Sequence, residues 1–488
     1  MAHLLLLSTY ELGEQPLGIA LPAAVLGAAG HELSATDLSL DTWPTNQLQQ
    51  VDGVICSVPM HTALRLAVAA IKRVLTECPQ LPIALVGLYA PVAERLGVLR
   101  PEDLATTGVD SLELLGWAAQ LGDKTLHATE QGDMLPRRGL LPPLDRYAHL
   151  ERDGMELLVG AVEASTGCNH RCRHCPVPLV FHGRSHAVDL DLVLGDIGQL
   201  VELGAGHIHF ADPDFLNRPQ HARRVAKAIA HEHPGLSFDI TAKISHLLRY
   251  RDLLPELAET GLAFVISAFE STSDLVLSRL DKGHSSRDLG EAVKVLRAVG
   301  VEPRPSLLPF TPWTTRQDLI ELLDFVASYD LVWNVDPVQY TIRLLLPPGS
   351  LLLDDQDVET RAALIGYNAE ELGYTWKHAD PLLDDLQRAI SNTVEQATHN
   401  DVRTDAAYEQ IRALVFSTFD LNDPGPPTPI NVGRGDGPSR PRLSEPWFCC
   451  AEPTKEQFKR FADARLPDTE PVAVTLGDRR SRLGGDHS

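Results

Sequence analysis

The chain of 488 residues lacks any apolar run long enough to cross a bilayer. Its longest early run is Leu4 to Leu7, whereas a membrane-spanning helix needs about 20 residues. The same run has neither a basic flank nor a small-residue cleavage site, so it is not typical of a signal peptide. We therefore expect a cytoplasmic protein without a membrane partner.

Positive charge is also scarce. The 43 lysines and arginines are outnumbered by 66 aspartates and glutamates, which gives a formal net charge of −23. Such a chain repels a phosphate backbone, and no basic stretch interleaved with aromatic residues stands out against this background. We therefore do not expect nucleic acid as a partner.

Cysteine is scarce as well. The chain has seven cysteines, an odd number, and most of them are clustered. Without a secretion signal, this pattern favours metal or redox chemistry over a disulfide framework.

The first part of the chain predicts an α/β fold. A length of 488 residues exceeds the roughly 250–300 that one hydrophobic core supports, so we expect several domains. In residues 1–130, apolar strand patterns alternate with helical ones, which predicts a Rossmann-like, doubly wound domain with a parallel sheet. The strands are expected at 3–9, 51–58 and 82–88, with helices at 16–33 and 62–75. Residues 131–154, rich in proline and turn formers, read as a linker.

Residues 155–353 resume the alternation and predict a partial or complete (β/α) barrel. A helix over 189–206 shows one apolar face and stops near Gly204, a suitable C-terminal cap. Strand patterns follow at 207–212, 236–244, 262–270, 302–310 and 335–346. The chemistry of such barrels gathers at the carboxyl ends of the strands.

The C-terminal part carries less regular patterns. We expect a mainly helical extension at 354–421, a linker rich in proline and glycine at 422–446, and a short cysteine-containing tail segment at 447–466. Residues 467–488 are predicted to be disordered.

The stretch "CNHRCRHC" places Cys168, Cys172 and Cys175 within eight positions. A structural zinc site needs four ligands, and the other cysteines lie far away in sequence. Three thiolates suit a four-iron cluster that keeps one iron free for an exogenous ligand. Zinc held by the three cysteines and one nearby histidine stays open as an alternative; the candidates are His170, His174 and His182.

The motif C-x-x-x-C-x-x-C, preceded by the strand-like "LLVGAVEASTG", resembles the radical S-adenosylmethionine (SAM) superfamily. This resemblance implies that the three cysteines hold a [4Fe-4S] cluster and that its free iron binds SAM. Reductive cleavage of SAM would then give a 5′-deoxyadenosyl radical that abstracts hydrogen from a small-molecule or peptide substrate. It also implies an electron donor such as flavodoxin or ferredoxin.

The same resemblance suggests roles for residues at other strand ends. Asp212 and Asp214 would bind the methionine amino group, Glu270 and Ser271 the ribose, and Arg304 the methionine carboxylate. Structural roles stay open for each of them: an N-cap for Asp214, capping for Glu270 and Ser271, and a salt bridge for Arg304.

The N-terminal domain resembles the cobalamin-binding domains of one branch of this superfamily. The likeness rests on "LLSTYELGEQPLGIALPAAVLGAAGHEL" and "DGVICSVPMHTALRLA". It implies cobalamin as a candidate cofactor and methyl transfer as a candidate reaction. The loop "TYELGEQPLG" has no D-x-H-x-x-G motif, and Leu88 stands where relatives often have a glycine. A retained structural domain is the alternative.

Near the end of the chain, "FCCAEP" contains the neighbouring Cys449 and Cys450. A disulfide between adjacent cysteines needs a strained ring, so this pair is expected to be redox-active, unless both thiols simply pack behind Trp447 and Phe448. Together with "FADPDFLN", "TAKISHLL" and "PVQYTIRLLLPPGS", this tail resembles the CUAEP/CCAEP-tail radical SAM (seleno)proteins. That resemblance implies Cys450 as the reactive thiol and Cys449 as its resolving partner.

Three functional hypotheses follow. The first is a radical SAM enzyme with a redox-active cysteine pair, and the second is a cobalamin-dependent radical SAM methyltransferase. The third is a non-catalytic protein that binds metal or handles thiols or selenium.

Overall fold

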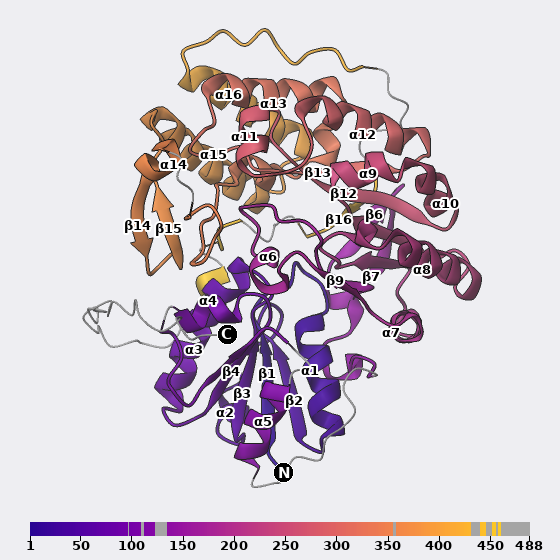
Figure 1. Cartoon of the computed structure of the whole chain (residues 1–488), viewed down its shortest axis with the longest axis vertical. Coiled ribbons are helices and arrows are strands. Elements are labelled where there is room, and N and C mark those ends of the chain that lie inside the picture. The colour runs from indigo at the N-terminus through magenta and orange to yellow at the C-terminus, as the bar shows by residue number, and fades with distance from the viewer. Residues whose placement is uncertain are drawn as a thin grey trace, which may run out of the picture.

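The structure is a computed structural model that describes residues 1–95, 97–108, 112–122, 134–354, 358–430, 440–445, 451–454 and 457–459. An N-terminal α/β domain lies at the bottom of Figure 1, and a second α/β domain with additional helices lies above it. Within the described ranges, no helix is both long and apolar enough to cross a membrane.

The N-terminal domain is built on a five-stranded parallel sheet in the order β2-β1-β3-β4-β5. Helices cover both faces, so its central strands are apolar along their whole length. The strands are β1 (His3–Ser8), β2 (Glu32–Asp37), β3 (Gly53–Ser57), β4 (Ile83–Val86) and β5 (Leu104–Thr106). Helices α1 (Leu17–Ala28) and α5 (Leu112–Leu121) pack on one face, and α2 (Thr45–Leu48), α3 (His61–Glu77) and α4 (Ala90–Arg95) lie on the other.

This domain confirms the doubly wound prediction and its three strands. The two edge strands were missed. β2 begins at Glu32, inside the range assigned to the first helix, which ends at Ala28. An edge strand is covered less completely and carries polar residues such as Ser34 and Thr36, so its pattern is weak.

The second sheet has seven strands in the order β13-β12-β11-β10-β7-β6-β16. Five of them run parallel: β7 (Met155–Val162), β10 (His207–Phe210), β11 (Ser237–Thr241), β12 (Leu262–Glu270) and β13 (Glu302–Leu307). β6 (His149–Arg152) and β16 (Arg442–Leu443) extend the β7 edge in antiparallel pairing. The helices that follow the parallel strands include α7 (Leu190–Glu202), α8 (Pro219–Glu232), α10 (Leu254–Glu259), α12 (Ser286–Ala298) and α13 (Arg316–Ser328).

This domain is a partial barrel, and its chain order confirms most of the predicted elements. Helix α7 buries Val193, Ile197 and Leu200, and Gly204 takes the left-handed conformation after its last turn. The strand predicted over 335–346 is wrong: Pro337–Thr341 form a 3₁₀ helix, and only Arg343 bridges to Phe310. Pro337 has no N–H to donate to a strand ladder.

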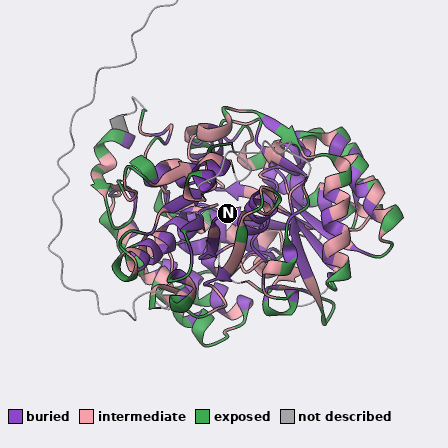
Figure 2. Ribbon diagram, turned by 90° about the horizontal axis from the view of Figure 1, so that it is seen from below, coloured by how far each residue is buried: buried purple, intermediate pink, exposed green. Residues whose placement is uncertain are grey.

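The C-terminal part contains α14 (Val358–Ala363), α15 (Pro381–His399) and α16 (Thr404–Thr418). It also contains an unpredicted hairpin of β14 (Leu364–Asn368) and β15 (Gly373–Trp376). Helices α15 and α16 pack against each other (Figure 1), and their buried apolar residues belong to the core of the partial barrel. Figure 2 shows the resulting distribution of burial, with the strands buried and the outer helices exposed along one side.

A buried ion pair ties the segment between the domains to the barrel. Arg138 donates to both carboxylate oxygens of Asp196 on α7, at 3.0 and 2.7 Å, and to the Ala161 carbonyl of β7 at 2.6 Å. The preceding Arg137 N–H donates to the Ala20 carbonyl of α1. Arg137 therefore contacts the N-terminal domain, and the next residue, Arg138, contacts the barrel.

We expect Asp196→Ala to lower the free energy of unfolding by about 3–5 kcal/mol, because it leaves the Arg138 charge buried without its partner. Chemical denaturation followed by circular dichroism measures this change. Asp385→Ala is the matched control, since Asp385 and its partner Arg388 are both exposed, and it should shift the midpoint little. Equal stability of the two variants would contradict the role assigned to the buried pair.

Candidate functional site

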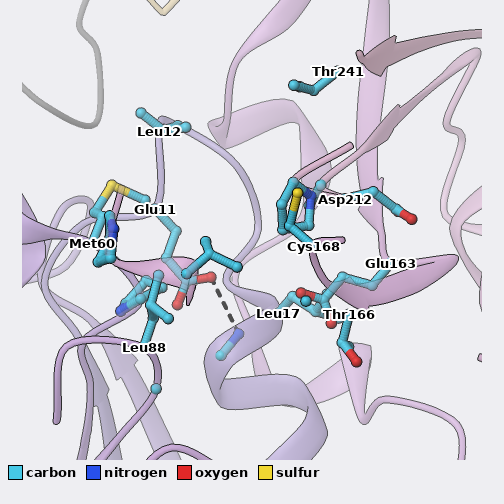
Figure 3. Close-up of a pocket in the computed structure, with 18 of the residues that line it drawn as sticks. Glu11, Leu12, Leu17, Met60, Leu88, Glu163, Thr166, Cys168, Asp212 and Thr241 are labelled. Carbon is cyan, nitrogen blue, oxygen red and sulfur yellow. Dashed lines mark hydrogen bonds between the residues drawn. The ribbon is translucent and has the colours of Figure 1, made fainter. Parts of the chain in front are cut away.

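A cavity of about 960 Å³ lies between the two domains. Its walls come from the loops at the carboxyl ends of β1, β3 and β4 and from the carboxyl ends of the barrel strands. Figure 3 shows Cys168, Asp212 and Thr166 on one side and Glu11, Met60 and Leu88 on the other. The carboxyl ends of the strands of both parallel sheets thus face the same cavity. This is the edge at which α/β folds bind ligands.

All three cysteines of the sequence motif line this cavity. They follow the short strand β8 (Ser165–Gly167), which pairs with β9 (Ser185–Ala187). Gly167 has a φ of +73°, and a Cβ on it would lie 2.4 Å from the Arg184 carbonyl oxygen. Glycine therefore allows the sharp entry into the cysteine loop. Cys168 and Cys172 are buried, and Cys175 is partly exposed.

Two buried lysines place positive charge next to the thiols, and neither of them was predicted from the sequence. The Lys243 Nζ lies 3.3 Å from the Cys172 Sγ, and the Lys282 Nζ lies 2.8 Å from the Glu270 Oε1. Burial raises the pKa of the Cys175 thiol to about 12, so bound iron must displace its proton. Three thiolates would need compensating charge in such a setting, which the lysines supply. The donor set therefore fits an iron–sulfur cluster.

The three thiols are not gathered around one point in this structure. Among the described residues, only His170, Asp214 and His246 form a set of three potential ligands whose atoms all lie within 4.8 Å. The three thiols are spread more widely, whereas Zn–S bonds of about 2.3 Å would draw them closer together. The nearby imidazoles are also engaged elsewhere: His170 faces Asp214, and the His174 Nε2 lies 3.3 Å from the Glu270 Oε1.

Asp212 and Asp214 follow directly after β10, but their side chains lie in different surroundings. Asp212 lines the cavity and accepts hydrogen bonds from the Ala164 N–H at 2.8 Å and the Ser165 hydroxyl at 2.5 Å. Burial raises its pKa to about 7 against the effect of these bonds. Asp214 accepts from the Leu216 N–H, which is the capping role left open above.

Asp214 also links the cysteine loop to helix α9 (Ile244–Arg249). Its Oδ2 lies 2.8 Å from the His246 Nδ1 and 3.6 Å from the His170 Nε2. Burial alone would raise the pKa of Asp214, but these two imidazoles hold it below its ordinary value. The role predicted for both aspartates toward the methionine amino group stays a prediction.

Glu270 lines the cavity at an irregularity of β12, where its φ is +61°. Burial alone would raise its pKa, but Lys282 and His174 hold it well below its usual range. Ser271 is buried, and its hydroxyl accepts from the Ser273 N–H at 3.1 Å. The structure thus places only Glu270 on the cavity wall, and a ribose contact of either residue stays a prediction.

Arg304 lies away from the cavity wall. Its guanidinium donates to both carboxylate oxygens of Asp336 at 2.7 Å and to the Pro441 carbonyl at 3.2 Å. This is the salt bridge that the sequence left open as an alternative. Cys449 and Cys450 lie outside the described residues, so their role also stays a prediction.

The N-terminal wall of the cavity is mainly apolar, with Leu12, Leu17, Met60 and Leu88 in Figure 3. Glu11 is a polar residue of this wall: its carboxylate accepts from the Gly18 N–H at 3.2 Å and the Ser57 hydroxyl at 2.9 Å. Burial raises the pKa of Glu11 to about 7. A large, apolar wall at this sheet edge fits a bulky cofactor such as cobalamin.

Sequence reasoning also missed Glu14 and His209, which line the same cavity from opposite domains. One signal was available. His209 belongs to a strand whose carboxyl end was expected at the site, and Glu14 belongs to the loop after β1, whose histidine motif was found absent. Because the loop lacks the D-x-H-x-x-G motif, a search for that motif does not identify Glu14.

Residues 162–326 match the Radical SAM superfamily. Among curated proteins, an uncharacterized methyltransferase of Pyrococcus horikoshii is 25% identical over 214 residues, 44% of each chain. The hopanoid C-3 methylase of Methylococcus capsulatus is 25% identical over 336 residues, 61% of this chain and 62% of its own. The chain thus spans less than two thirds of the length of either relative.

Two solved structures share the fold. OxsB, a cobalamin-dependent S-adenosylmethionine radical enzyme with aqua-cobalamin bound, aligns with a TM-score of 0.62 at 14% identity, covering 86% of this chain and 72% of its own. TsrM of Kitasatospora setae, a radical SAM methyltransferase with cobalamin and a [4Fe-4S] cluster bound, aligns with a TM-score of 0.51 at 18% identity, covering 67% and 70%. At these identities the likeness concerns the fold.

The match covers the strands, the cysteine loop and the lysines that form the barrel side of the cavity. Such a domain implies a [4Fe-4S] cluster and SAM as cofactors. Over residues 162–326, the chain is thus similar to radical SAM superfamily domains.

Proposed function

We propose that this protein uses a [4Fe-4S] cluster on Cys168, Cys172 and Cys175 to cleave SAM and modify a small-molecule or peptide substrate. When bound, the cluster supplies one electron that releases a 5′-deoxyadenosyl radical from SAM. The observation that carries the proposal is the position of the three thiols on one wall of a large cavity, with two buried cations beside them.

The protein's own residues would bind the cofactor and protect the reaction. Lys243 and Lys282 offset the thiolate charge, and Asp214 contacts both His170 of the cysteine loop and His246 of helix α9. Asp212 would accept the methionine amino group, and Glu270 would contact the ribose, since both face the cavity. The surrounding apolar wall excludes water. An external reductant such as flavodoxin or ferredoxin would supply the electron.

After anaerobic reconstitution and reduction with dithionite, the wild-type protein should convert SAM to 5′-deoxyadenosine. Cys172→Ala should reduce this conversion by at least roughly 100-fold, because the cluster loses one of its three ligands. Liquid chromatography measures the product. Cys78→Ala, which alters a half-buried thiol of the N-terminal domain, is the control and should retain activity. Full activity of Cys172→Ala would refute the assignment.

A second candidate function is cobalamin-dependent methyl transfer. It is favoured by the apolar wall that the N-terminal domain turns toward the cysteines across the cavity. Leu12, Leu17, Met60 and Leu88 would contact the cofactor's ring and Glu11 its polar edge. The names of several relatives, which are methyltransferases or methylases, support the same reaction class.

If this candidate is correct, the wild-type protein should retain about one hydroxocobalamin per chain after gel filtration. Leu88→Trp should weaken the binding by roughly tenfold or more, because overfilling a packed wall costs about 1–3 kcal/mol. Absorbance spectra measure bound cobalamin. Leu112→Trp, on an exposed side chain, should bind as the wild type does, and iron content should be the same in both variants. A wild-type protein that retains no cobalamin would rule this candidate out.

We also propose that Cys449 and Cys450 form a redox-active pair that serves the same cavity. The support comes from the residue that follows the pair: Ala451 is buried, and its carbonyl accepts a hydrogen bond from the Thr62 hydroxyl at 2.9 Å. Thr62 adjoins His61, which lines the cavity. The tail is thus anchored next to the proposed site.

Mild oxidation with diamide should convert the pair to a disulfide, seen as a loss of two hydrogen atoms from the peptide that contains it. In Cys449→Ser, glutathione disulfide should instead give a mixed disulfide on Cys450. Mass spectrometry of the digested protein measures both products. Cys56, buried in β3, is the internal control and should stay reduced. Modification of Cys56 before the pair would contradict the proposal.

A further inference from the structure

Glu14 and His209 face each other across the cavity from different domains. Glu14 lies in the loop between β1 and α1, and His209 lies on β10 of the barrel. The Glu14 Oε1 is 3.8 Å from the His209 Nε2. This distance is too long for a hydrogen bond but short enough for a strong charge interaction. Within the described part of the chain, His209 is the one ionic partner of Glu14 within 4.0 Å.

The His209 ring is held in one orientation from behind. Its Nδ1 is hydrogen-bonded to the Asp239 Oδ2 at 2.8 Å, and the Asp239 Oδ1 is bound to the His207 Nε2 at 2.9 Å. The His207 Nδ1 is in turn 2.8 Å from the Ser237 hydroxyl. All of these groups are buried or nearly so. Such a chain fixes the imidazole so that its Nε2 points toward Glu14.

The charges around this pair keep the imidazole positive. Burial would lower the pKa of His209, but the carboxylates of Asp239, Glu14 and Asp212 raise it to about 10. Asp239 keeps its charge, because His209 and His207 lower its pKa against the effect of burial. The ring is therefore an imidazolium over the neutral pH range.

For Glu14, in contrast, the effect of burial on the pKa outweighs that of the nearby charges. Burial raises its pKa to about 7, with Asp239 and Glu445 adding to the rise and His209 and Arg138 opposing it. Arg138 is already bound to Asp196, so its effect on Glu14 is indirect. A carboxyl group with such a balance gains and loses a proton near neutral pH.

We propose that Glu14 is the acid–base group of the cavity and takes up the proton that the substrate releases, with His209 and Asp239 as its positioning residues. The inference rests on the second candidate function, methyl transfer. When a substrate X–H receives a methyl group as a cation equivalent, the X–H electron pair forms the X–CH₃ bond, and the methyl donor, a sulfonium or a methylcobalamin, would keep the electron pair of its broken bond to the methyl carbon. The proton then forms an O–H bond on the Glu14 carboxylate, next to the fixed imidazolium. No further oxidant or reductant is required for this step.

The test uses dicyclohexylcarbodiimide, an apolar reagent that modifies protonated carboxyl groups, on the full-length protein without added cofactor. Labelling is followed against pH by tandem mass spectrometry. Glu14 should be half-labelled near pH 7, as should Glu11, which serves as the reference on the same loop. In His209→Asn, the Glu14 midpoint should move to higher pH because the imidazolium is lost. The Glu11 midpoint should move much less, because Glu14 is only a minor cause of its raised pKa.

Half-labelling of Glu14 near its ordinary value of 4.5, or equal midpoints in wild type and His209→Asn, would overturn the proposal. Should His209→Asn fail to fold by circular dichroism, the wild-type midpoint decides the question, and His209→Gln repeats the comparison. Glu14→Gln must lose the label at that position and verifies the assignment. Because labelling requires neither cluster nor SAM, failure here is distinguishable from failure to produce 5′-deoxyadenosine.

Discussion

The site depends on one geometric constraint, namely that two parallel sheets turn their carboxyl edges toward the same space. Each sheet alone would offer a shallow crevice at its strand ends. Facing each other, they enclose a cavity to which one domain contributes the cysteine loop and the other an apolar wall. The Arg138–Asp196 pair, with the adjoining contact of Arg137 to α1, is one of the interactions that hold this arrangement. A cofactor that bridges the domains would add its own binding energy to the interface.

The cavity is electrostatically divided. On the barrel side, Lys243 and Lys282 approach the thiols, so ionised sulfur is favoured there once metal displaces the protons. On the opposite side, Glu11 and Glu14 lie in a setting that favours the neutral carboxylic acid at and below neutral pH. The proposed cluster would thus lie beside the two lysines, whereas Glu11 and Glu14 carry only partial charge near neutral pH. This division keeps the net cost of burying charge small.

Much of the fold could be predicted from the sequence, because buried parallel strands read as apolar runs and α7 shows a clear 3.6-residue period. The cysteine motif could also be recognised, because its three cysteines lie within one short stretch of the sequence. The edge strand β2 could not be recognised from a weak, polar pattern. The pattern of residues 335–346 predicted a strand although Pro337, which cannot donate to a strand ladder, lies in a 3₁₀ helix. Lys243, Lys282 and the Glu14–His209 contact depend on segments distant in the chain, and a single sequence does not report such contacts.

The position of Glu14 also bears on how a substrate hydrogen leaves. A radical that abstracts a hydrogen atom takes its proton and electron together, and such a step has no use for a base. A polar methyl transfer releases a proton into a cavity walled largely by apolar side chains, where water cannot accept it readily. A carboxylate poised next to a fixed imidazolium meets that need, because the proton it takes up neutralises a buried charge. The presence of this pair in the cavity therefore favours heterolytic chemistry for at least one step of the reaction.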